Sequence, residues 1–228
     1  MKIKCRIIGF DLDGTLLNSE KHIAEHTREV LTRAVEQGIW ILPVTGRPLG
    51  GLPKEVVEFP GVQYAITANG ARNMETQTGG CLYERLVPVK TAEQIMELFR
   101  DYDALRVASY GRKGHAEAEV FSRVGEYMRS PQMAVYVRAT RTPVPDILQL
   151  IREKGQDTDK VQGVFKIDEE RTEARKRLEA VEGIEVTGAL SNNIEVNAAG
   201  VDKGNAILWF ADHLGIPHEE VAGFGDGH

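Results

Sequence analysis

The chain has few cysteines and no long apolar run, and both absences exclude whole classes of protein. Its two cysteines, Cys5 and Cys81, are far apart and lack the spacing of a paired motif, which excludes a small disulfide-stabilised scaffold. We expect both to be small buried residues in a reduced, cytoplasmic protein. No apolar stretch approaches the length of a membrane span, and the basic start at residues 1–4 leads into a short apolar segment that ends at Asp11. We therefore expect a first strand there instead of a signal peptide, and no membrane partner.

Clusters of positive charge are also absent. The formal net charge is −6, and no run of Lys and Arg suggests a track for a phosphate backbone, which argues against a general nucleic-acid-binding role. With 42% hydrophobic and 27% charged residues, the 228-residue chain has the composition of a globular protein with one large or two modest domains. An anionic ligand would therefore have to be held by a few local groups.

The most informative segment is IIGFDLDGT at residues 7–15, an apolar strand followed by two carboxylates and a glycine. Buried parallel strands are almost continuously apolar, and chemistry gathers just beyond their carboxyl ends. Asp11 and Asp13 would repel one another there unless they share a cation or one of them holds a proton, which predicts a metal site with divided acid and nucleophile roles. Gly14 lets the backbone approach a ligand closely. For this segment alone, an ordinary turn or a calcium loop is the alternative.

An alternation of helices and strands follows this segment. Residues 22–37 carry apolar or small residues at a helical period and stop before Gly38. Residues 39–45 form a second apolar strand that ends in polar residues. A short helix after Pro48 leads to a third strand at residues 64–67. This alternation predicts an α/β fold with a doubly wound parallel sheet.

The pattern then changes, beginning with a hairpin predicted at residues 71–75 and 81–85. The following block mixes helices and strands and is long enough to form its own α+β domain. Its helices are expected near residues 91–100, 144–154 and 169–181, and its strands near residues 104–110, 133–139, 161–167 and 184–187. The first pattern returns in a strand at 193–197, a helix from about 201 to 214 and a strand at 221–224. The chain is therefore interpreted as a core domain of residues 1–85 and 188–228 that carries an inserted domain of residues 86–187.

Four polar motifs follow strand ends or begin a helix in a fixed order: DLDGT at 11–15, TGR at 45–47, Lys203, and GD at 225–226. In this order they resemble the motifs of the haloacid dehalogenase-like (HAD) superfamily of phosphatases and phosphotransferases. The motif ANGA at residues 68–71, the position of the insertion and the segment around Lys203 are similar to the Cof-type branch with a class IIB cap. The resemblance implies a Rossmann-like core and identifies the inserted block as an α+β cap domain.

The resemblance implies that Asp11 is the nucleophile that attacks phosphorus and forms an aspartyl-phosphate, which divides one difficult displacement into two easier steps. Asp13 would protonate the leaving alkoxide and then activate water, which requires a raised pKa. Thr45 would donate its hydroxyl to a phosphate oxygen, and Lys203 would balance the charge of Asp11 and of the phosphoryl group. Taken alone, Thr45 is better explained as a helix N-cap and Lys203 as a solvated lysine, but their positions within the set of four motifs reverse this preference.

The same resemblance implies a magnesium ion. Asp11, the main-chain carbonyl of Asp13, and Asp226 would supply oxygen ligands, which magnesium prefers, with water and phosphate completing the set. The motif residues expected to contact substrate are Gly14, Gly46, Arg47, Asn69 and Gly70. Turn and surface roles are the alternatives for Arg47 and Asn69.

The expected activity is magnesium-dependent hydrolysis of small phosphorylated metabolites, with sugar phosphates favoured by the resemblance, in a monomer or homodimer. A mutase-type phosphotransferase is one alternative, because an aspartyl-phosphate can pass its phosphoryl group to a second hydroxyl. A catalytically impaired binding or regulatory module is another, because the family pattern would continue beyond His228 with Asn-Asp and further elements. We therefore expect weak or absent turnover from the 228-residue chain and activity in a longer form.

Three further patterns have weaker functional interpretations. His22 and His26 match the HxxEH pattern of inverted zinc peptidases, but no third ligand is identifiable and ordinary helix packing explains them. The basic segment at residues 111–115 is interpreted as a solvated loop, with a substrate-specificity loop as the alternative. Asn192 and Asn193 could act as hinge, substrate-binding or turn residues.

Overall fold

The computed structural model describes residues 4–188 and 191–226. The chain divides into two compact units, the first formed by Met1–Glu84 with Val201–His228 and the second by Arg85–Gly200. The expected beginning of the first strand at residues 1–3, and residues 227–228 after the fourth motif, lie outside the described residues. Among the described helices, none combines the length and the apolar character needed to cross a membrane.

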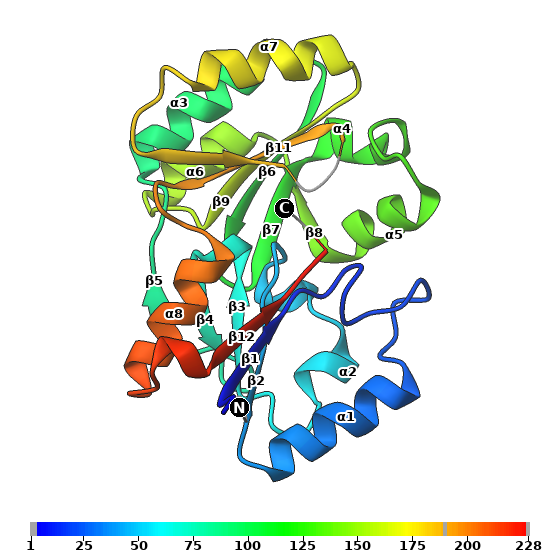
Figure 1. Ribbon diagram of the computed structural model, residues 1–228. Helices are drawn as coiled ribbons and strands as arrows, with labels where there is room; N and C mark the ends of the chain where they lie inside the picture. Colours follow the sequence, from blue (N-terminus) through cyan, green and yellow to red (C-terminus); the bar gives the residue numbers. More distant parts are fainter. Residues whose placement is uncertain (1–3, 189–190, 227–228) are drawn as a thin grey trace. The chain divides into compact units, whose positions relative to one another are not determined.

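The first unit is built on a parallel sheet, as the sequence predicts. Strand β1 (Ile7–Phe10) lies between β12 (Val221–Phe224) and β2 (Trp40–Pro43) and pairs with both in parallel (Figure 1). A parallel bridge from Val44 to Ile66 links the end of β2 to β3 (Tyr64–Thr67). The predicted hairpin then continues the pairing in antiparallel fashion, in the order β3, β4 (Arg72–Glu75) and β5 (Cys81–Glu84). The α/β class with a doubly wound core is therefore confirmed.

Helices cover both faces of the parallel sheet because successive strand side chains point to opposite sides. Phe10 and Ile41 belong to a buried cluster shared with α1 (Glu25–Glu36) and α2 (Lys54–Val57). Ile7 and Leu42 belong to a second cluster that contains Phe210 of α8 (Lys203–His213). The two clusters fix the sheet between its helices and therefore fix the carboxyl ends of its strands.

Helix α1 begins three residues later than the sequence pattern indicates. The expected start is at residue 22, but Lys21 has a left-handed backbone, with φ of 65°, and Ile23 forms an antiparallel bridge with Leu17. Ala24 is the N-cap and Glu25 the first helical residue. The apolar pattern begins before the helix does, because Ile23 is buried although it lies in the preceding loop.

The second unit is a six-stranded sheet with helices on its faces, in the strand order β10-β11-β9-β6-β7-β8 (Figure 1). The strands are β6 (Ala104–Tyr110), β7 (Lys113–Glu117), β8 (Arg141–Val144), β9 (Lys160–Phe165), β10 (Ile184–Thr187) and β11 (Asn193–Ala198). The helices are α3 (Val89–Phe99), α4 (Ala118–Ser122), α5 (Pro131–Thr140), α6 (Ile147–Lys154) and α7 (Asp168–Leu178). All pairings are antiparallel except that of β7 with β8.

Two apolar layers hold this second sheet. Leu105 and Val107, two positions apart on β6, share a buried cluster with Val137 of α5. On β9, the strand next to β6, Phe165 contacts Phe99 of α3 in an edge-on arrangement, with ring centroids 5.6 Å apart. The expected helices near 91–100, 144–154 and 169–181 correspond to α3, α6 and α7.

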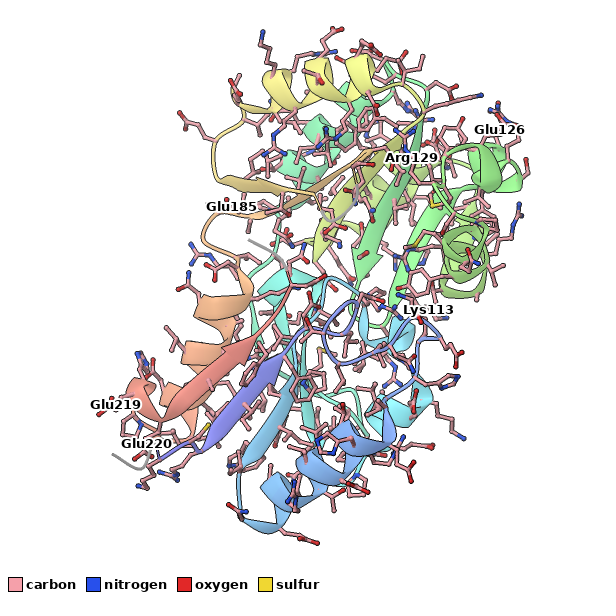
Figure 2. All side chains as sticks on the ribbon, turned by 45° about the vertical axis from the view of Figure 1, so that its right-hand side comes forward. Lys113, Glu126, Arg129, Glu185, Glu219 and Glu220 are labelled. Atoms are coloured by element: carbon pink, nitrogen blue, oxygen red, sulfur yellow. The ribbon has the colours of Figure 1, made fainter. Side chains whose placement is uncertain are left out.

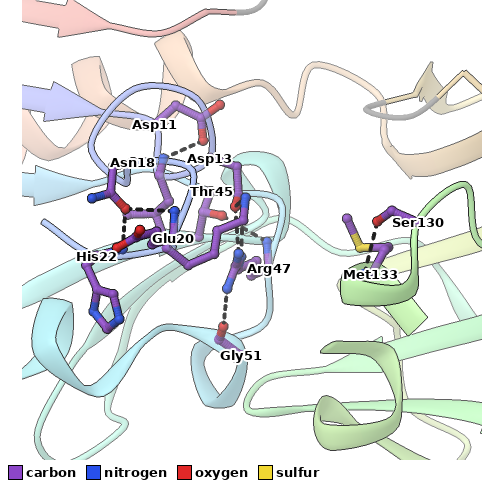
Figure 3. A network of polar contacts seen from close by, with 12 residues as sticks. Asp11, Asp13, Asn18, Glu20, His22, Thr45, Arg47, Gly51, Ser130 and Met133 are labelled. Atoms are coloured by element: carbon purple, nitrogen blue, oxygen red, sulfur yellow. Dashed lines mark hydrogen bonds and ion pairs between the residues drawn. The ribbon is translucent and has the colours of Figure 1, made fainter. Parts of the chain in front are cut away.

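Two predictions for this unit are wrong. Residues 133–139 were expected to form a strand but lie within helix α5, where the Ser130 hydroxyl accepts a hydrogen bond from the Met133 amide at 3.2 Å and Pro131 occupies the first turn (Figure 3). A Ser cap followed by Pro is a helix-start signal that outweighs the strand preference of Val135, Tyr136 and Val137. Residues 113–115 were expected in a solvated loop but belong to β7, paired with β6.

The border between the two units also differs from the expected one. Residues 188–200 were assigned to the core domain, with a core strand at 193–197. Strand β11 instead pairs with β9 and β10 of the second unit, and the first unit resumes at Val201. The sequence shows that a strand is present, but its sheet depends on pairing partners that are distant in sequence.

Ion pairs cover the outer surface of the second unit. Lys166 donates to Glu126 at 2.8 Å and Arg129 to Asp168 at 2.7 Å, and Figure 2 labels Glu126 and Arg129 near α5. All four side chains are exposed, so water screens each pair and its contribution to stability is small. We assign these pairs to surface solvation and not to a binding site.

Candidate active site

The site forms where β1 and β12 end side by side. The Asp11 amide, directly after β1, donates to the Phe224 carbonyl at 2.9 Å, so that β12 delivers Asp226 next to the loop that carries Asp11 and Asp13. Gly14 in this loop has a φ of 83°, and a Cβ atom there would lie 2.2 Å from Oδ2 of Asp226. Only glycine therefore fits between this loop and the Asp226 carboxylate.

Lys203 is paired with Asp11 although 192 positions separate them in the chain. Its Nζ donates to Asp11 Oδ2 at 2.6 Å, and Asp11 Oδ1 accepts from the Leu12 amide at 2.7 Å. Helix α8 starts at Lys203 because the side chain of Asp202 caps it, accepting from the Asn205 amide at 2.7 Å. Lys203 therefore contacts Asp11 directly while its side chain stays 39% exposed, and its role in catalysis stays a prediction.

Asp13 is held by two cationic side chains. Arg47 donates from Nε to Oδ2 at 3.0 Å and from Nη2 to Oδ1 at 2.7 Å, and Lys21 Nζ donates to Oδ1 at 2.9 Å. Figure 3 shows Arg47 directed at Asp13 and at the carbonyl of Gly51, which accepts from Nη1 at 3.0 Å. Arg47 therefore contacts the expected acid directly, in the bidentate geometry that suits guanidinium and carboxylate.

The expected rise in the pKa of Asp13 is not found. Burial raises the pKa of this carboxyl group, but the hydrogen bonds and charges of Arg47 and Lys21 outweigh that effect and place it below its ordinary value. The direction is therefore opposite to the sequence-based expectation. The sequence pattern identified Asp13 as a site carboxylate, but it did not predict that Arg47 and Lys21 would bind it.

Thr45 lies at the end of β2 and does not cap a helix. Its amide donates to the Ile66 carbonyl at 2.9 Å, and its hydroxyl oxygen accepts from the Arg47 amide at 3.2 Å. The N-cap of the next helical turn is Pro48. With only 2% of its surface exposed, Thr45 presents a preorganised hydroxyl at the carboxyl end of the sheet.

The motif after β3 is bound to the motif after β2. The Ala68 amide donates to the Arg47 carbonyl and the Asn69 amide to the Thr45 carbonyl, both at 3.0 Å, so Gly46 lies in a segment bracketed by main-chain bonds. Ala68 and Asn69 have left-handed backbones, with φ of 49° and 66°. Such backbones in residues other than glycine are uncommon and occur where surrounding contacts enforce them.

Gly70 connects this motif to the start of α8. Its φ is 110°, and a Cβ atom there would lie 2.4 Å from the Asp202 carbonyl oxygen. The absence of a side chain thus allows β3 and the first turn of α8 to approach closely. Gly70 therefore lies against the N-cap of the helix that begins at Lys203, and the substrate contact expected for it stays a prediction.

Two of the expected metal ligands, Asp11 and Asp226, lie on or beside the loop that carries Gly14. The Asp226 carboxylate lies against this loop, and the Asp11 carboxylate is on its first residue. Within residues 4–188 and 191–226, no group of three or more His, Cys, Asp and Glu side chains is arranged to hold a metal. The Asp13 carboxylate is engaged by Arg47 and Lys21, so the expected ligands that could hold a metal are the carboxylates of Asp11 and Asp226 and the Asp13 carbonyl, all hard oxygen donors.

Sequence reasoning missed Lys21. Its side chain reaches Asp13 because the loop at residues 18–22 reverses direction around Asn18, whose side-chain oxygen accepts from the amides of Glu20 and His22 at 3.0 and 2.9 Å (Figure 3). An asparagine followed by polar residues ahead of a helix is a turn signal. That signal was available in the sequence, although the direction of the Lys21 side chain was not.

The remaining candidate patterns have structural explanations. His22 lies 3.1 Å from Glu55 and precedes α1, whereas His26 lies on α1, so the HxxEH residues do not share a helix face. Asn192 donates to the carbonyls of Tyr127 and Phe165 at 2.8 and 2.9 Å and thereby fixes backbone in the second unit. Cys81 is exposed on β5, so its expected burial is wrong.

Comparisons with known proteins agree on one family. A family model described as haloacid dehalogenase-like hydrolase matches residues 8–228. A Bacillus subtilis (strain 168) protein named 5-amino-6-(5-phospho-D-ribitylamino)uracil phosphatase is 25% identical over 227 residues, which cover 98% of this chain and 78% of the relative.

Solved structures share the fold. A haloacid dehalogenase-like hydrolase from B. subtilis has a TM-score of 0.84 at 24% identity, covering 97% of this chain and 83% of the other. A sugar phosphatase of HAD subclass IIB has a TM-score of 0.78 at 20% identity, covering 97% of this chain and 81% of the other. The likeness extends over both units.

Proposed function

This chain belongs to the haloacid dehalogenase-like hydrolase family and is a phosphoric monoester hydrolase, and we propose that it hydrolyses small phosphorylated metabolites, sugar phosphates in particular, through an aspartyl-phosphate on Asp11. The observation that carries the proposal is the 2.6 Å hydrogen bond from Lys203 to Asp11. A carboxylate at a strand end, held by one cation and accompanied by a buried threonine hydroxyl at the end of the next strand, is equipped to receive a phosphoryl group.

In the first step, an Asp11 carboxylate oxygen forms a bond to phosphorus while the bond from phosphorus to the leaving oxygen breaks. Asp13, in its protonated form, gives a proton to that oxygen, which departs as an alcohol. Because Arg47 and Lys21 favour the ionised carboxylate, this step requires Asp13 to take up a proton when substrate binds. The Thr45 hydroxyl donates to a phosphoryl oxygen, and Lys203 offsets the negative charge that would otherwise oppose attack by a carboxylate. Each donor of this kind typically lowers the barrier by about 3–4 kcal/mol.

In the second step, a water molecule attacks the phosphorus of the aspartyl-phosphate. Asp13, now ionised, takes a proton from this water, and the bond between phosphorus and Asp11 breaks. Inorganic phosphate leaves and the Asp11 carboxylate is restored. The loop contacts of Gly14 and the tie between Asn69 and Thr45 keep these groups at fixed positions through both steps.

Phosphatases of this family generally use a divalent metal ion, and we assign magnesium to this chain. The residues that would hold it are Asp11, Asp226 and the main-chain carbonyl of Asp13, because hard oxygen donors suit magnesium. When bound, the ion would offset charge between Asp11 and the anionic substrate. Gly14 is essential to this arrangement, since a side chain there would displace the Asp226 carboxylate.

The preference for sugar phosphates is supported by two of the proteins that resemble this chain. One is named for a phospho-ribityl compound and the other is described as a sugar phosphatase, so both names refer to phosphate on a polyhydroxylated carbon chain. The monomeric or homodimeric state and the cytoplasmic location stay predictions from the sequence.

The test is hydrolysis of p-nitrophenyl phosphate by purified protein, with magnesium chloride or with EDTA, followed by a panel of sugar phosphates. Magnesium-dependent release should disappear in Asp11→Asn. Asp212→Asn is the matched control, because Asp212 is an exposed carboxylate paired with His218 and lies outside the site. Equal release by wild type and Asp11→Asn would refute the assigned nucleophile.

A further inference from the structure

Lys21 approaches Asp13 from a different segment than Arg47 does. Its Nζ lies 2.9 Å from Asp13 Oδ1, the same oxygen that accepts from Arg47 Nη2 at 2.7 Å. Arg47 already satisfies both carboxylate oxygens through its bidentate contact. Lys21 is therefore a second cation on a carboxylate that Arg47 already holds at both oxygens.

The loop that carries Lys21 is shaped to present this side chain. The Lys21 amide donates to the Asn18 carbonyl and the Asn18 amide to the His22 carbonyl, both at 2.9 Å. The Asn18 side chain closes the same turn by accepting from the Glu20 and His22 amides (Figure 3). Lys21 adopts a left-handed backbone, which is unfavourable for a lysine by about 1–2 kcal/mol. The turn thus directs an ammonium group toward the site at a conformational cost.

Lys21 adds a third cationic side chain to the candidate site. The carboxylates of Asp11, Asp13 and Asp226 are opposed by three cationic groups, those of Lys203, Arg47 and Lys21. Lys21 therefore balances the charge of these side chains and adds positive charge on the Asp13 side, where it would attract a phosphate monoester. An ammonium group also has three N–H donors, and the Asp13 carboxylate uses one of them.

The Lys21 ammonium is accessible to a ligand. Its side chain is 54% exposed, compared with 15% for Arg47. Within the described part of the chain, the hydrogen bond of its Nζ is the one to Asp13. A phosphoryl oxygen that arrives beside Asp13 would find an unburied donor already held near it.

We propose that Lys21 is a substrate-binding residue whose ammonium group donates to an oxygen of the phosphoryl group on the Asp13 side of the site. The inference rests on the proposed function, because it assumes that a phosphate monoester binds beside Asp11 and Asp13. The proposal adds the loop at residues 18–22 to the candidate site, beside the strand-end motifs and Lys203 of α8. The ligand class is the phosphate dianion itself, which is shared by every substrate of such an enzyme.

The experiment is calorimetric titration with inorganic phosphate in magnesium chloride, applied to wild type, Lys21→Met, Lys21→Arg and a control. A hydrogen bond between charged groups predicts about a tenfold or greater loss of phosphate affinity in Lys21→Met, with partial retention in Lys21→Arg. Lys54→Met is the matched control, because Lys54 is also a lysine paired with one carboxylate, at 3.4 Å from Glu58, and lies outside the site. Its phosphate affinity should equal that of wild type.

Several outcomes would overturn the proposal. Phosphate affinity in Lys21→Met within twofold of wild type would do so, including the case in which kcat falls, since that pattern belongs to a residue that only positions Asp13. Wild-type protein that binds no phosphate at millimolar concentration would also overturn it. Urea-unfolding midpoints of all variants confirm that each is folded. Hydrolysis by wild type is measured separately, so phosphate binding that depends on Lys21 without hydrolysis would reject the proposed function and leave this inference standing.

Discussion

The side-chain amide of Asn73 in β4 donates to the main-chain carbonyl of Ala206 in α8 at 3.3 Å. Asn73 is fully buried, and its contact lies within the first two turns of the helix that begins at Lys203. Together with the close approach of Gly70 to Asp202, it ties the hairpin to the helix that supplies the cation on Asp11. The hairpin therefore helps to fix the position of α8, which carries Lys203 in the candidate active site.

Removing this tie should destabilise the protein. We expect Asn73→Ala to lower the free energy of unfolding by about 1–3 kcal/mol, because a buried hydrogen bond is lost. Asn73→Asp should lower it more at neutral pH, since it places a carboxylate against a carbonyl in a buried position. Urea unfolding measures both effects. A loss below about 0.5 kcal/mol in both variants would contradict this role.

Gly14→Ala should abolish most activity. A Cβ atom would lie 2.2 Å from Asp226 Oδ2, so the carboxylate would have to move. Gly38→Ala is the matched control, because Gly38 also has a left-handed backbone, with φ of 76°, and a Cβ atom there would meet no described atom within 4 Å. Both variants should lose about 1–2 kcal/mol of stability, but only Gly14→Ala should lose at least about tenfold in kcat/KM. Equal activity in the two variants would show that Asp226 is not needed.

Thr45→Val tests the buried hydroxyl. Valine keeps the shape of threonine but cannot donate to a phosphoryl oxygen, so we expect kcat to fall by about 10²–10³. Thr45→Ser keeps the hydroxyl and should retain most of the rate. Steady-state kinetics with p-nitrophenyl phosphate distinguish the two, and similar rates in both variants would argue against a role for the hydroxyl.

A pH-dependent stability effect is expected in the second unit. Asp146 caps α6 by accepting from the amides of Leu148 and Gln149 at 2.8 and 3.0 Å. Burial raises its pKa, but these bonds and Arg100 outweigh that effect and place the pKa below its ordinary value. A carboxyl group with a lowered pKa in the folded state stabilises the protein above its unfolded-state pKa of about 3.9, and loses this effect as pH falls through the folded-state value.

Asp146→Asn keeps an acceptor for the cap but removes the charge. Wild type should therefore be more stable than Asp146→Asn at pH 7, and the difference should close as the pH falls below about 3.9. Urea unfolding at several pH values measures the difference. A constant difference across the range would show that the charge of Asp146 contributes nothing beyond its geometry.

The sequence predicted the parts of this protein that depend on local pattern. Apolar strands followed by polar residues located Asp11 and Thr45, because the end of a buried strand is visible in the sequence itself. The role of Lys203 in balancing the charge of Asp11 was implied by the family resemblance, and the structure brings the two side chains together.

The errors arose where long-range contacts decide the outcome. The sheet to which β11 belongs depends on its pairing with β9, which no local pattern encodes. The direction of the Asp13 pKa shift depends on Lys21 and Arg47, which approach from separate loops. The helix α5 is a different case, because the Ser130–Pro131 start signal was present in the sequence and was outweighed by a run of strand-favouring residues.

The pairing of β1 with β12 has a consequence for how the protein folds during synthesis. The strand that carries Asp11 pairs with one at the far end of the chain, in the register Ile7 with Val221. Arg85 and Gly200, the first and last residues of the intervening unit, lie close together, because a Cβ atom on Gly200 would lie 3.3 Å from the Arg85 side chain. On a ribosome this unit can fold first and shorten the effective loop between β1 and β12, which lowers the entropy lost when they meet. Its early folding would then hasten completion of the catalytic sheet.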